Sequence, residues 1–490
     1  MAPGVIKTEY LVIGSGVGGS IAADVLSKSG KEVTVVEDGE YHPDGWFGNR
    51  ISAGIKSLYR NNGVVPLIGS PMIPFAEARC VGGGTVINGA LLWRTPNWIL
   101  DEWRANCGLS GFGVDDLKSH FELIERTLNV KRHSPDDSGN QDSQLLMNGA
   151  SKLGWATTMA PRAVTNCVNE NLCPIGCGEC GKQSTLQNFL PQAGSKGARV
   201  IPGVRVSRIS SGSGGSYTVD GASNVNGTTS RVTFNAEHVV VAGGPINTPF
   251  LLKKSGLGKN VGNNLKFHMN LKVIAVFKDE INAHDGTIFT AQVQEFEREG
   301  MYMMASTLQP HLLVTTAGHY GNSTINHLLE NYARSAIYVA MIKPKSSGQI
   351  ISYAGSSPIV RYRFDPEDLP QIRSALLRIS TLLFEAGAEE IYLPLRDSSA
   401  LRSLDEVVRE LDSLDHRRVE IVSVHGMSSA PMGGSAESAA VRPDGSLWED
   451  GNILVTDSSM LPSSTGESPQ GTIMAMAREA LSRQPNITVD

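Results

Sequence analysis

The stretch Leu11-Val-Ile-Gly-Ser-Gly-Val-Gly-Gly19 decides the fold class of this chain. It spaces Gly14, Gly16 and Gly19 as G-x-G-x-x-G, after the apolar run Tyr10 to Ile13 and before a helical stretch. The first glycine permits a tight turn, the second lets the backbone approach a pyrophosphate, and the third allows close packing of helix on strand. Because N–H groups at a helix start also favour phosphate, the stretch predicts a dinucleotide-binding loop.

The residues that follow complete a βαβ unit. After the helical stretch Ser20 to Ser29, a second apolar strand runs from Glu32 to Val36 and ends at Glu37. Strands that alternate with helices in this way indicate a parallel sheet. An acidic residue at the end of the second strand is placed to accept hydrogen bonds from a ribose. Glu37 is therefore a predicted cofactor-binding residue. The alternative for the glycine loop is a turn with a purely structural role.

The size and composition of the chain are typical of a globular enzyme with two domains. Its 490 residues are 40% hydrophobic, and 43 basic against 49 acidic residues leave a net charge of −6. No basic block marks a surface for nucleic acid, so we expect no nucleic-acid partner. No apolar run approaches the roughly 18 residues that span a bilayer, and the first residues lack the pattern of a secretory signal. We therefore expect no membrane span, and a soluble protein in the cytoplasm.

Further segments bring glycines beside apolar strands. The block from Arg79 to Arg94 contains three successive glycines, at 82–84, which let the main chain lie close to a flat or charged ligand. The run His238 to Pro249 passes from a buried strand into a glycine turn and a helix. Near the end of the chain, a short apolar strand from Asn452 to Asp457 resembles the strands that precede these glycine turns. We therefore expect these segments to belong to one sheet and to complete a single cofactor site on it.

The middle of the chain has a different pattern. Longer strands at Leu271 to Phe277, Ile337 to Ile342 and Pro358 to Phe364 predict a separate, largely antiparallel sheet. The polar, glycine-rich segment Gly212 to Thr229 is expected to be an exposed hairpin tip. Three methionines are expected either in an ordinary core or along an apolar pocket: Met301, Met303 and Met304.

These patterns predict an α/β fold with a discontinuous, Rossmann-like cofactor domain and an inserted substrate domain built on the antiparallel sheet. The cofactor domain is expected over residues 1–160, 181–265 and 425–490, a cysteine-rich loop over 161–180, and the substrate domain over 266–424. The loop's cysteines suit disulfides or structural thiols, unpaired loop cysteines, or a metal: Cys167, Cys173, Cys177 and Cys180. No metal-binding residue is assigned.

Together these segments resemble the glucose–methanol–choline (GMC) oxidoreductases, flavoproteins that oxidise alcohols with FAD. The resemblance covers essentially the whole chain and rests on blocks that occur in the same order. They are the glycine loop with Glu37, the block Arg79 to Arg94, and the segments Gly244 to Gly258, His425 to Gly433 and Asn452 to Ala477. The cysteine-rich lead into residues 181–186 and the run 469–475 are most similar to the branch of long-chain alcohol and sterol-type oxidases.

The resemblance implies that the cofactor is FAD. The isoalloxazine ring would lie along the backbone of residues 82–88, Asp457 would contact the ribityl or pyrophosphate region, and Val206 would bind the adenine end through its main chain. The full set of expected FAD-binding residues is Gly14, Gly16, Gly19, Glu37, Arg79, Gly83, Gly84, Asn88, Gly89, Val206, Ala242, Asp457 and Pro469.

The resemblance also points to catalytic roles for His425 and Ser468. His425 and Met432 reproduce the H-x6-M spacing of the family, and histidine is suited to proton transfer near neutral pH. His425 is expected to accept the substrate's hydroxyl proton or to orient the substrate, with a structural histidine as the alternative. His268 is expected to be structural. Ser468 stands where the family usually has Asn or His; its hydroxyl is not a base near neutral pH, so Glu467 or Gln470 could compensate.

The prediction is FAD-dependent oxidation of an alcohol, hydrophobic and long-chain or cyclic, to the carbonyl by hydride transfer to flavin N5. Electrons would pass to oxygen or to another acceptor, which is compatible with an oxidase and with a dehydrogenase. The alternative is a non-redox flavoprotein lyase similar to the hydroxynitrile lyases of the family, which the change at Ser468 favours. A flavin-binding scaffold without a redox role is a third hypothesis.

Overall fold

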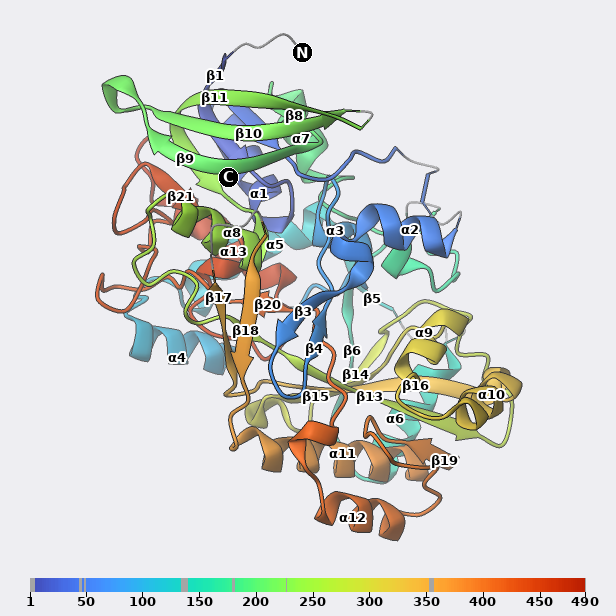
Figure 1. The fold of residues 1–490 in the computed structure, drawn as a ribbon. Helices are drawn as coiled ribbons and strands as arrows, with labels where there is room; N and C mark the ends of the chain where they lie inside the picture. The colour runs from blue at the N-terminus through green and yellow to red at the C-terminus, as the bar shows by residue number, and fades with distance from the viewer. Residues whose placement is uncertain are drawn as a thin grey trace.

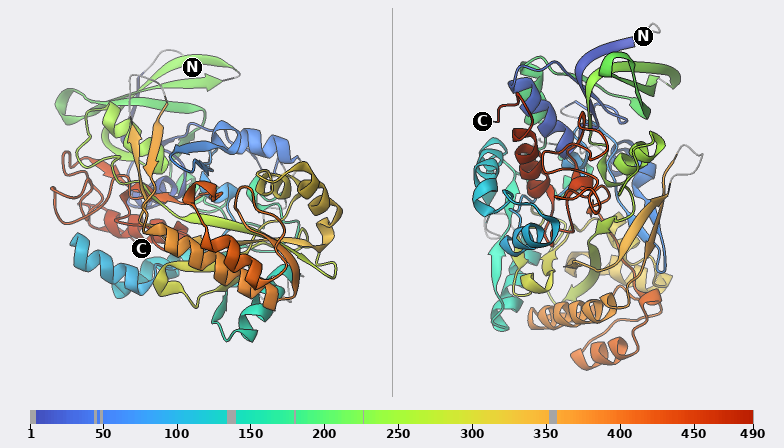
Figure 2. Two further views of the ribbon diagram at one scale, coloured as in Figure 1. Left: turned by 60° about the horizontal axis from the view of Figure 1, so that its bottom comes forward. Right: turned by 90° about the vertical axis from the view of Figure 1, so that its left-hand side faces the viewer.

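The computed structural model describes residues 5–43, 46–47, 50–133, 140–178, 181–225, 227–351 and 357–489. Two large sheets organise the chain (Figure 1), and Figure 2 shows them from two further directions. The first sheet carries the strands of the glycine-rich segments, and the second carries the longer strands of the middle of the chain. The predicted α/β class is confirmed.

The first sheet is parallel in its centre and continues into an antiparallel ribbon. Its order is β8-β2-β1-β11-β10-β9, and β21 also pairs with β11. The pairs from β8 to β11 and the pair β11–β21 are parallel, whereas β11–β10 and β10–β9 are antiparallel. The strands are β1 Val5–Ile13, β2 Val33–Val36, β8 Arg199–Ile201, β9 Val204–Ser211, β10 Tyr217–Val225, β11 Thr228–Val241 and β21 Ile453–Val455.

Helices hold the glycine loop against this sheet. Helix α1 (Val17–Lys28) begins directly after the loop, is buried from Gly18 to Ser27, and packs against α13 (Gln470–Ser482) and α7 (Phe189–Ser195). Helix α5 (Val114–Thr127) packs on α13. The tail returns to this sheet as predicted, because residues 239–241 of β11 pair with 453–455 of β21.

The expectation of an exposed hairpin tip at Gly212 to Thr229 is wrong. Half of this segment is strand β10, which lies between β9 and β11. Tyr217 and Val219 are buried while the residues between and after them are partly exposed, so the strand alternates with the period of two that a half-buried ribbon requires. The many polar residues and Gly221 concealed this alternation in the sequence.

The second sheet is antiparallel throughout, as predicted, with the order β19-β13-β16-β15-β14-β6. Its strands are β6 Thr157–Met159, β13 Met269–Phe277, β14 Ala291–Val293, β15 Met301–Ala305, β16 Ser335–Ile342 and β19 Ala388–Tyr392. Helices α6 (Gln141–Lys152) and α11 (Asp368–Glu385) pack on it, and α12 (Leu404–Asp412) packs on α11. The domain limits stay a prediction; β6 and α6, which fall before residue 160, belong to this second layer.

Smaller elements join the two sheets. The strand expected at Pro358 to Phe364 is β18, which lies outside the six-stranded sheet, in a mixed sheet of order β17-β18-β3-β4. Strands β12 and β20 pair and bring residues 266–267 beside 426–427. The remaining bounds are α2 Ile51–Leu58, β3 Val65–Ile68, β4 Ile73–Phe75, α3 Gly84–Ile87, α4 Asn97–Cys107, β5 Val130–Arg132, β7 Pro161–Ala163, α8 Gly244–Lys254, β12 Lys266–Phe267, α9 Pro310–Thr316, α10 Asn322–Glu330, β17 Ser347–Ile351, β18 Ile359–Arg363 and β20 Gly426–Met427.

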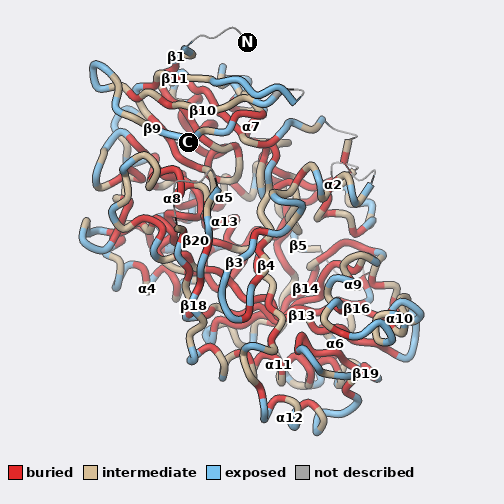
Figure 3. The backbone as a smooth tube through the Cα atoms, viewed as in Figure 1, coloured by how far each residue is buried: buried red, intermediate tan, exposed pale blue. Residues whose placement is uncertain are grey.

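The apolar core has two large parts. One cluster fills the first sheet and its helices, and the other lies between the antiparallel sheet and helices α6, α11 and α12. Figure 3 shows buried backbone in both parts. In the portion of the chain that the structure describes, no helix combines the length and the apolar character that crossing a bilayer needs.

Gly18 provides a test of how closely α1 must approach the sheet. A Cβ at Gly18 would lie 2.1 Å from the carbonyl oxygen of Thr456, so Gly18→Ala forces the helix and β21 apart. Overpacking of this kind costs about 1–3 kcal/mol, and we expect a lower apparent Tm in thermal unfolding. Gly194→Ala, in α7 with open space around its Cβ position, is the matched control and should leave Tm unchanged or raise it slightly. Equal Tm values for the two variants would contradict this account.

Candidate active site

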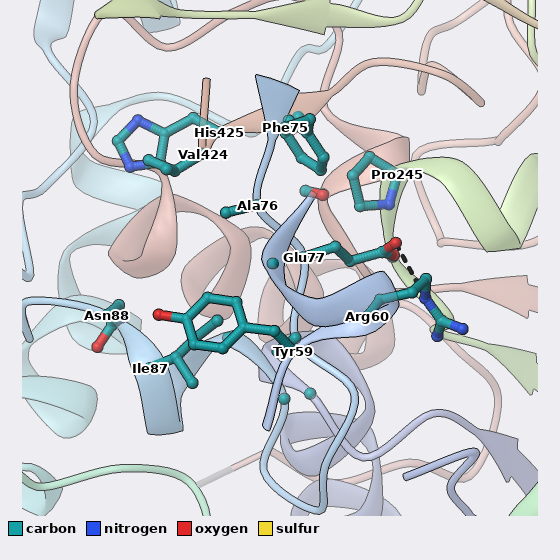
Figure 4. A pocket seen from close by; sticks show the side chains of 18 of the residues that line it. Tyr59, Arg60, Phe75, Ala76, Glu77, Ile87, Asn88, Pro245, Val424 and His425 are labelled. Atoms are coloured by element: carbon teal, nitrogen blue, oxygen red, sulfur yellow. Dashed lines mark ion pairs between the residues drawn. The ribbon is translucent and has the colours of Figure 1, made fainter. Parts of the chain in front are cut away.

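A large cavity lies between the two sheets. It has a volume of about 1300 Å³ and is lined by the glycine loop, residues 83–89, strands β13, β15 and β16, and the segments around His425 and Ser468. In Figure 4, His425 and Asn88 lie on one side of this cavity, and the ion pair of Glu77 with Arg60 lies on the other. Of the residues expected at the site, all except Gly19 and Arg79 line it.

The glycine loop forms one wall through backbone contacts. Gly14 has a φ of +101°, and a Cβ there would lie 2.2 Å from the carbonyl oxygen of Ala242. A Cβ at Gly83 would lie 2.6 Å from Cα of Gly16, so the two glycine-rich segments touch main chain to main chain. Gly19 packs within the turn, since its Cβ would lie 1.9 Å from the carbonyl oxygen of Gly14. Gly19 therefore shapes the loop without lining the cavity.

Glu37 lies at the end of β2 with its carboxylate fixed by the glycine loop. Its Oε2 accepts hydrogen bonds from the backbone N–H (2.9 Å) and the hydroxyl (2.8 Å) of Ser15, and its Oε1 accepts one from the N–H of Gly39 (2.8 Å). Burial raises the pKa of Glu37. Arg79 is half-exposed and pairs with Asp38 at 3.3 Å, so it supports the neighbouring carboxylate from outside the cavity.

Asp457 joins the loop after β21 to the start of α8. Its Oδ2 accepts from the N–H of Gly244 (2.7 Å) and the hydroxyl of Thr248 (2.5 Å), both in α8. Its Oδ1 accepts from the N–H of Ser459 (2.8 Å) and from the hydroxyl of the same residue. Burial raises the pKa of Asp457, which these donors partly offset. The carboxylate thus fixes the loop after β21 against the start of α8, at the edge of the cavity.

Residues 84–89 are held from behind by a lysine that the sequence analysis did not identify. The Lys182 ammonium donates to the carbonyl oxygens of Val86, Asn88 (3.0 Å) and Cys173 (2.7 Å). The Asn88 side chain donates to Oε1 of Gln470. Asn88 is thereby fixed through both its main chain and its side chain. A lysine beside a cysteine-rich loop carries no sequence signal for this role.

The cysteines that the structure describes, in the cysteine-rich loop and outside it, are present as free thiols. Cys80, Cys107, Cys167, Cys173 and Cys177 are free cysteines, and Cys180 lies outside the described residues. Within the described ranges, no group of three or more His, Cys, Asp or Glu side chains could hold a metal ion. The alternatives of disulfide or metal therefore find no support among the described cysteines.

His425 is paired with His268. Their Nδ1 atoms lie 3.1 Å apart, and the N–H of Gly466 donates to Nε2 of His268 at 3.2 Å. Because Nε2 of neutral His268 accepts, its proton lies on Nδ1 and is donated to Nδ1 of His425. The proton of neutral His425 then lies on Nε2, the ring atom turned away from His268. Burial lowers the pKa of His425 to about 4 and that of His268 well below its usual range, so both rings are neutral near pH 7.

Glu467 and Ser468 follow Gly466 along the cavity wall. Oε1 of Glu467 accepts from Nε2 of Gln292 at 2.5 Å, whereas Oε2 is buried with no hydrogen-bond partner among the described residues. Burial raises the pKa of Glu467 to about 8. Ser468 lines the cavity and is 9% exposed. The segment thus places one unusually basic carboxyl on the cavity wall, one residue beyond the amide that is hydrogen-bonded to His268.

The three methionines of β15 separate by strand alternation. Met304 lines the cavity, while Met301 and Met303 lie in the core of the antiparallel sheet. Met304 therefore fits the expectation of an apolar pocket, and Met301 and Met303 fit the expectation of an ordinary core. Asn270 and Lys272, on β13, also line the cavity and were not identified from the sequence.

Comparisons with known proteins agree with this geometry. Models of the GMC oxidoreductase family match residues 55–270 and 344–477. An uncharacterized GMC-type oxidoreductase of Mycobacterium tuberculosis is 32% identical over 97% of this chain and 75% of its own length. A long-chain-alcohol oxidase of Arabidopsis thaliana is 27% identical over 96% of this chain and 68% of its own.

Solved structures extend the similarity to the fold. A formate oxidase of Aspergillus oryzae superposes with a TM-score of 0.75 at 13% identity, covering 98% of each chain. At that identity the similarity concerns the fold alone. With the family matches, it accounts for the glycine loop, the two sheets and the cavity between them. The chain belongs to the GMC oxidoreductase family and is an FAD-dependent oxidoreductase.

Proposed function

We propose that the protein oxidises an alcohol to the corresponding carbonyl compound, with His425 assisting removal of the hydroxyl proton. The observation that carries this proposal is the His268–His425 pair, which leaves one ring nitrogen of His425 for a ligand in the cavity. The similarity to long-chain-alcohol oxidases supports an alcohol as substrate. Oxygen or another acceptor then takes the electrons.

The residues around the cavity fit FAD. Side chains are excluded where the glycine loop meets Ala242 and Gly83, which leaves bare main chain for a phosphate, and Glu37 lies at the end of β2 for a ribose. Asn88, Gly89 and Pro469 line the same cavity as His425, and Asn88 lies in the part of it that faces His425 (Figure 4). We assign the flavin ring to that part, the adenine end to Val206, and the remaining contacts to the residues predicted from the sequence. FAD supplies the hydride acceptor when it is bound.

His425 orients the substrate in the neutral state of the pair. Its Nε2–H donates a hydrogen bond to the substrate oxygen, because the N–H of Gly466 fixes the tautomer of His268 and His268 fixes that of His425. An Nε2 that carries a proton cannot accept another. The hydroxyl proton therefore needs a second acceptor unless both rings change tautomer.

Glu467 is the acceptor that the cavity offers. Its Oε2 lacks a hydrogen-bond partner among the described residues, and it lies one residue beyond the amide that fixes the histidine pair. With a pKa of about 8, its carboxylate is a stronger base than an ordinary glutamate. Glu467 thus acts as the proton acceptor, a role that the hydroxyl of Ser468 cannot fill near neutral pH.

His425→Ala removes the donor to the substrate oxygen. We expect flavin reduction by an alcohol substrate to fall about 10²–10⁴-fold in anaerobic stopped-flow measurements, while FAD remains bound. His416→Ala, at a histidine outside the cavity, is the control and should reduce at the normal rate. Near-normal reduction in the His425 variant would exclude the assignment.

The pH dependence of flavin reduction distinguishes the two candidate proton acceptors, Glu467 and the His268–His425 pair. A carboxyl with a pKa of about 8 is protonated below that pH and becomes a base above it, so flavin reduction should rise as pH increases through 8. Glu467→Gln should lower the rate and remove the rise. His425 is neutral at every pH above about 4, so a rate that stays flat from about pH 5 to 9 would exclude Glu467 and favour a tautomer change in the histidine pair.

A flavoprotein lyase without net oxidation is the second candidate, favoured by Ser468 at the cavity wall. Its test is an anaerobic titration with primary, long-chain and cyclic alcohols, followed by replacement of FAD with a redox-inactive analogue. Bleaching of the flavin by an alcohol supports the oxidoreductase. Activity that survives the replacement supports the lyase.

A further inference from the structure

One lobe of the cavity is polar and cationic. We call it the lysine lobe and define it by side chains that all line the cavity: Asn270, Lys272, Ser306, Thr307 and His311. These side chains donate or accept no hydrogen bond within the described part of the chain, and Lys272 forms no ion pair there. Their hydrogen-bonding capacity is therefore available to a ligand.

Strand β13 fixes the distance from this lobe to the histidine pair. His268 immediately precedes β13, and Asn270 and Lys272 follow on the same face because side chains alternate with a period of two. At about 3.3 Å per residue, Cα of Lys272 lies roughly 13 Å along the strand from Cα of His268. The lysine lobe and the reacting end are thus two ends of one elongated site.

Apolar side chains of the neighbouring strands lie beside Asn270 and Lys272 on this face. Val339 of β16 pairs with Lys272 in the strand register, and Met304 of β15 pairs with Val339. Met341, which pairs with Asn270, lies on the same face. All three apolar residues line the cavity. A ligand that reaches from His425 to Lys272 therefore has these apolar side chains beside it.

Among the residues that the structure describes, no acidic side chain pairs with Lys272. Burial alone lowers its pKa, and its charge contributes to the lowered pKa of His311. Glu420, which also lines the cavity, forms an ion pair with Arg396, and Asp397 next to Arg396 is exposed. A half-buried ammonium without a partner is unfavourable, and an anionic ligand would offset that cost.

We propose that the lysine lobe binds a carboxylate at the end of the substrate remote from the hydroxyl group, so that the substrate is an ω-hydroxy acid with an apolar middle. This inference rests on the proposed alcohol oxidation at His425. Lys272 supplies the charge, and Asn270, Ser306, Thr307 and His311 supply neutral donors. A lysine contacts a carboxylate as a point charge, which suits a flexible terminal group.

The first test measures binding without turnover. Decanoate, which has no hydroxyl group to oxidise, is titrated into the holoenzyme by calorimetry beside methyl decanoate. We expect decanoate to bind more tightly than its ester, and Lys272→Met to weaken decanoate binding roughly ten- to hundredfold with little change for the ester. Lys272→Arg should keep the preference. Lys266→Met, at a lysine outside the cavity that binds the carbonyl of Lys345, is the matched control.

The second test uses flavin reduction by ω-hydroxydecanoate and by its methyl ester. The wild type should prefer the acid in KM, and Lys272→Met should lose that preference. Equal affinities for acid and ester, or a Lys272→Met variant that loses FAD but keeps decanoate binding, would overturn the inference. If neither compound bleaches the flavin while decanoate still binds through Lys272, the lobe stands and the proposed oxidation fails.

Discussion

The fold depends on backbones that must touch where no side chain fits. Gly14 meets the carbonyl of Ala242, Gly18 meets that of Thr456, and Gly83 meets Gly16. These contacts join segments from the beginning, middle and end of the chain around the start of α1. Each added Cβ would displace a strand end or a loop, and with it one wall of the cavity. The discontinuous arrangement of the first sheet follows from this constraint.

The parallel sheet was predictable because its signals are local. An apolar strand, a glycine turn and a helix follow one another at residues 10–28, and again at 238–254. The ribbon strand β10 was not predictable, because half-buried polar residues and Gly221 obscure its alternation. Strand β18 was found at the right residues but assigned to the wrong sheet, since a strand pattern carries no information about its neighbours.

The candidate site likewise contains residues that were predictable from the sequence and residues that were not. Residues in ordered glycine and histidine motifs were predictable, and the predicted residues other than Gly19 and Arg79 line the cavity. Lys182 and Lys272 were not predictable, because a single lysine in a loop or strand looks like any other. Their roles come from burial and from contacts between distant segments. The position of Glu467 was visible in the sequence, but its basicity depends on how deeply the fold buries it.

On the proposed function, strand β13 places proton transfer and substrate recognition at different points along one strand. His268 fixes the tautomer of His425 at one end of β13, and Lys272 projects from the same face farther along the strand. Because a strand is stiff, the two ends keep a constant spacing while the side chains between them vary. Val339 and Met341 come from the neighbouring strand β16, which carries neither histidine of the pair. On the proposed function, changes at those positions or at Lys272 would therefore alter which substrate fits the cavity, while the hydrogen bonds from Gly466 to His268 and between His268 and His425 would hold His425 in place.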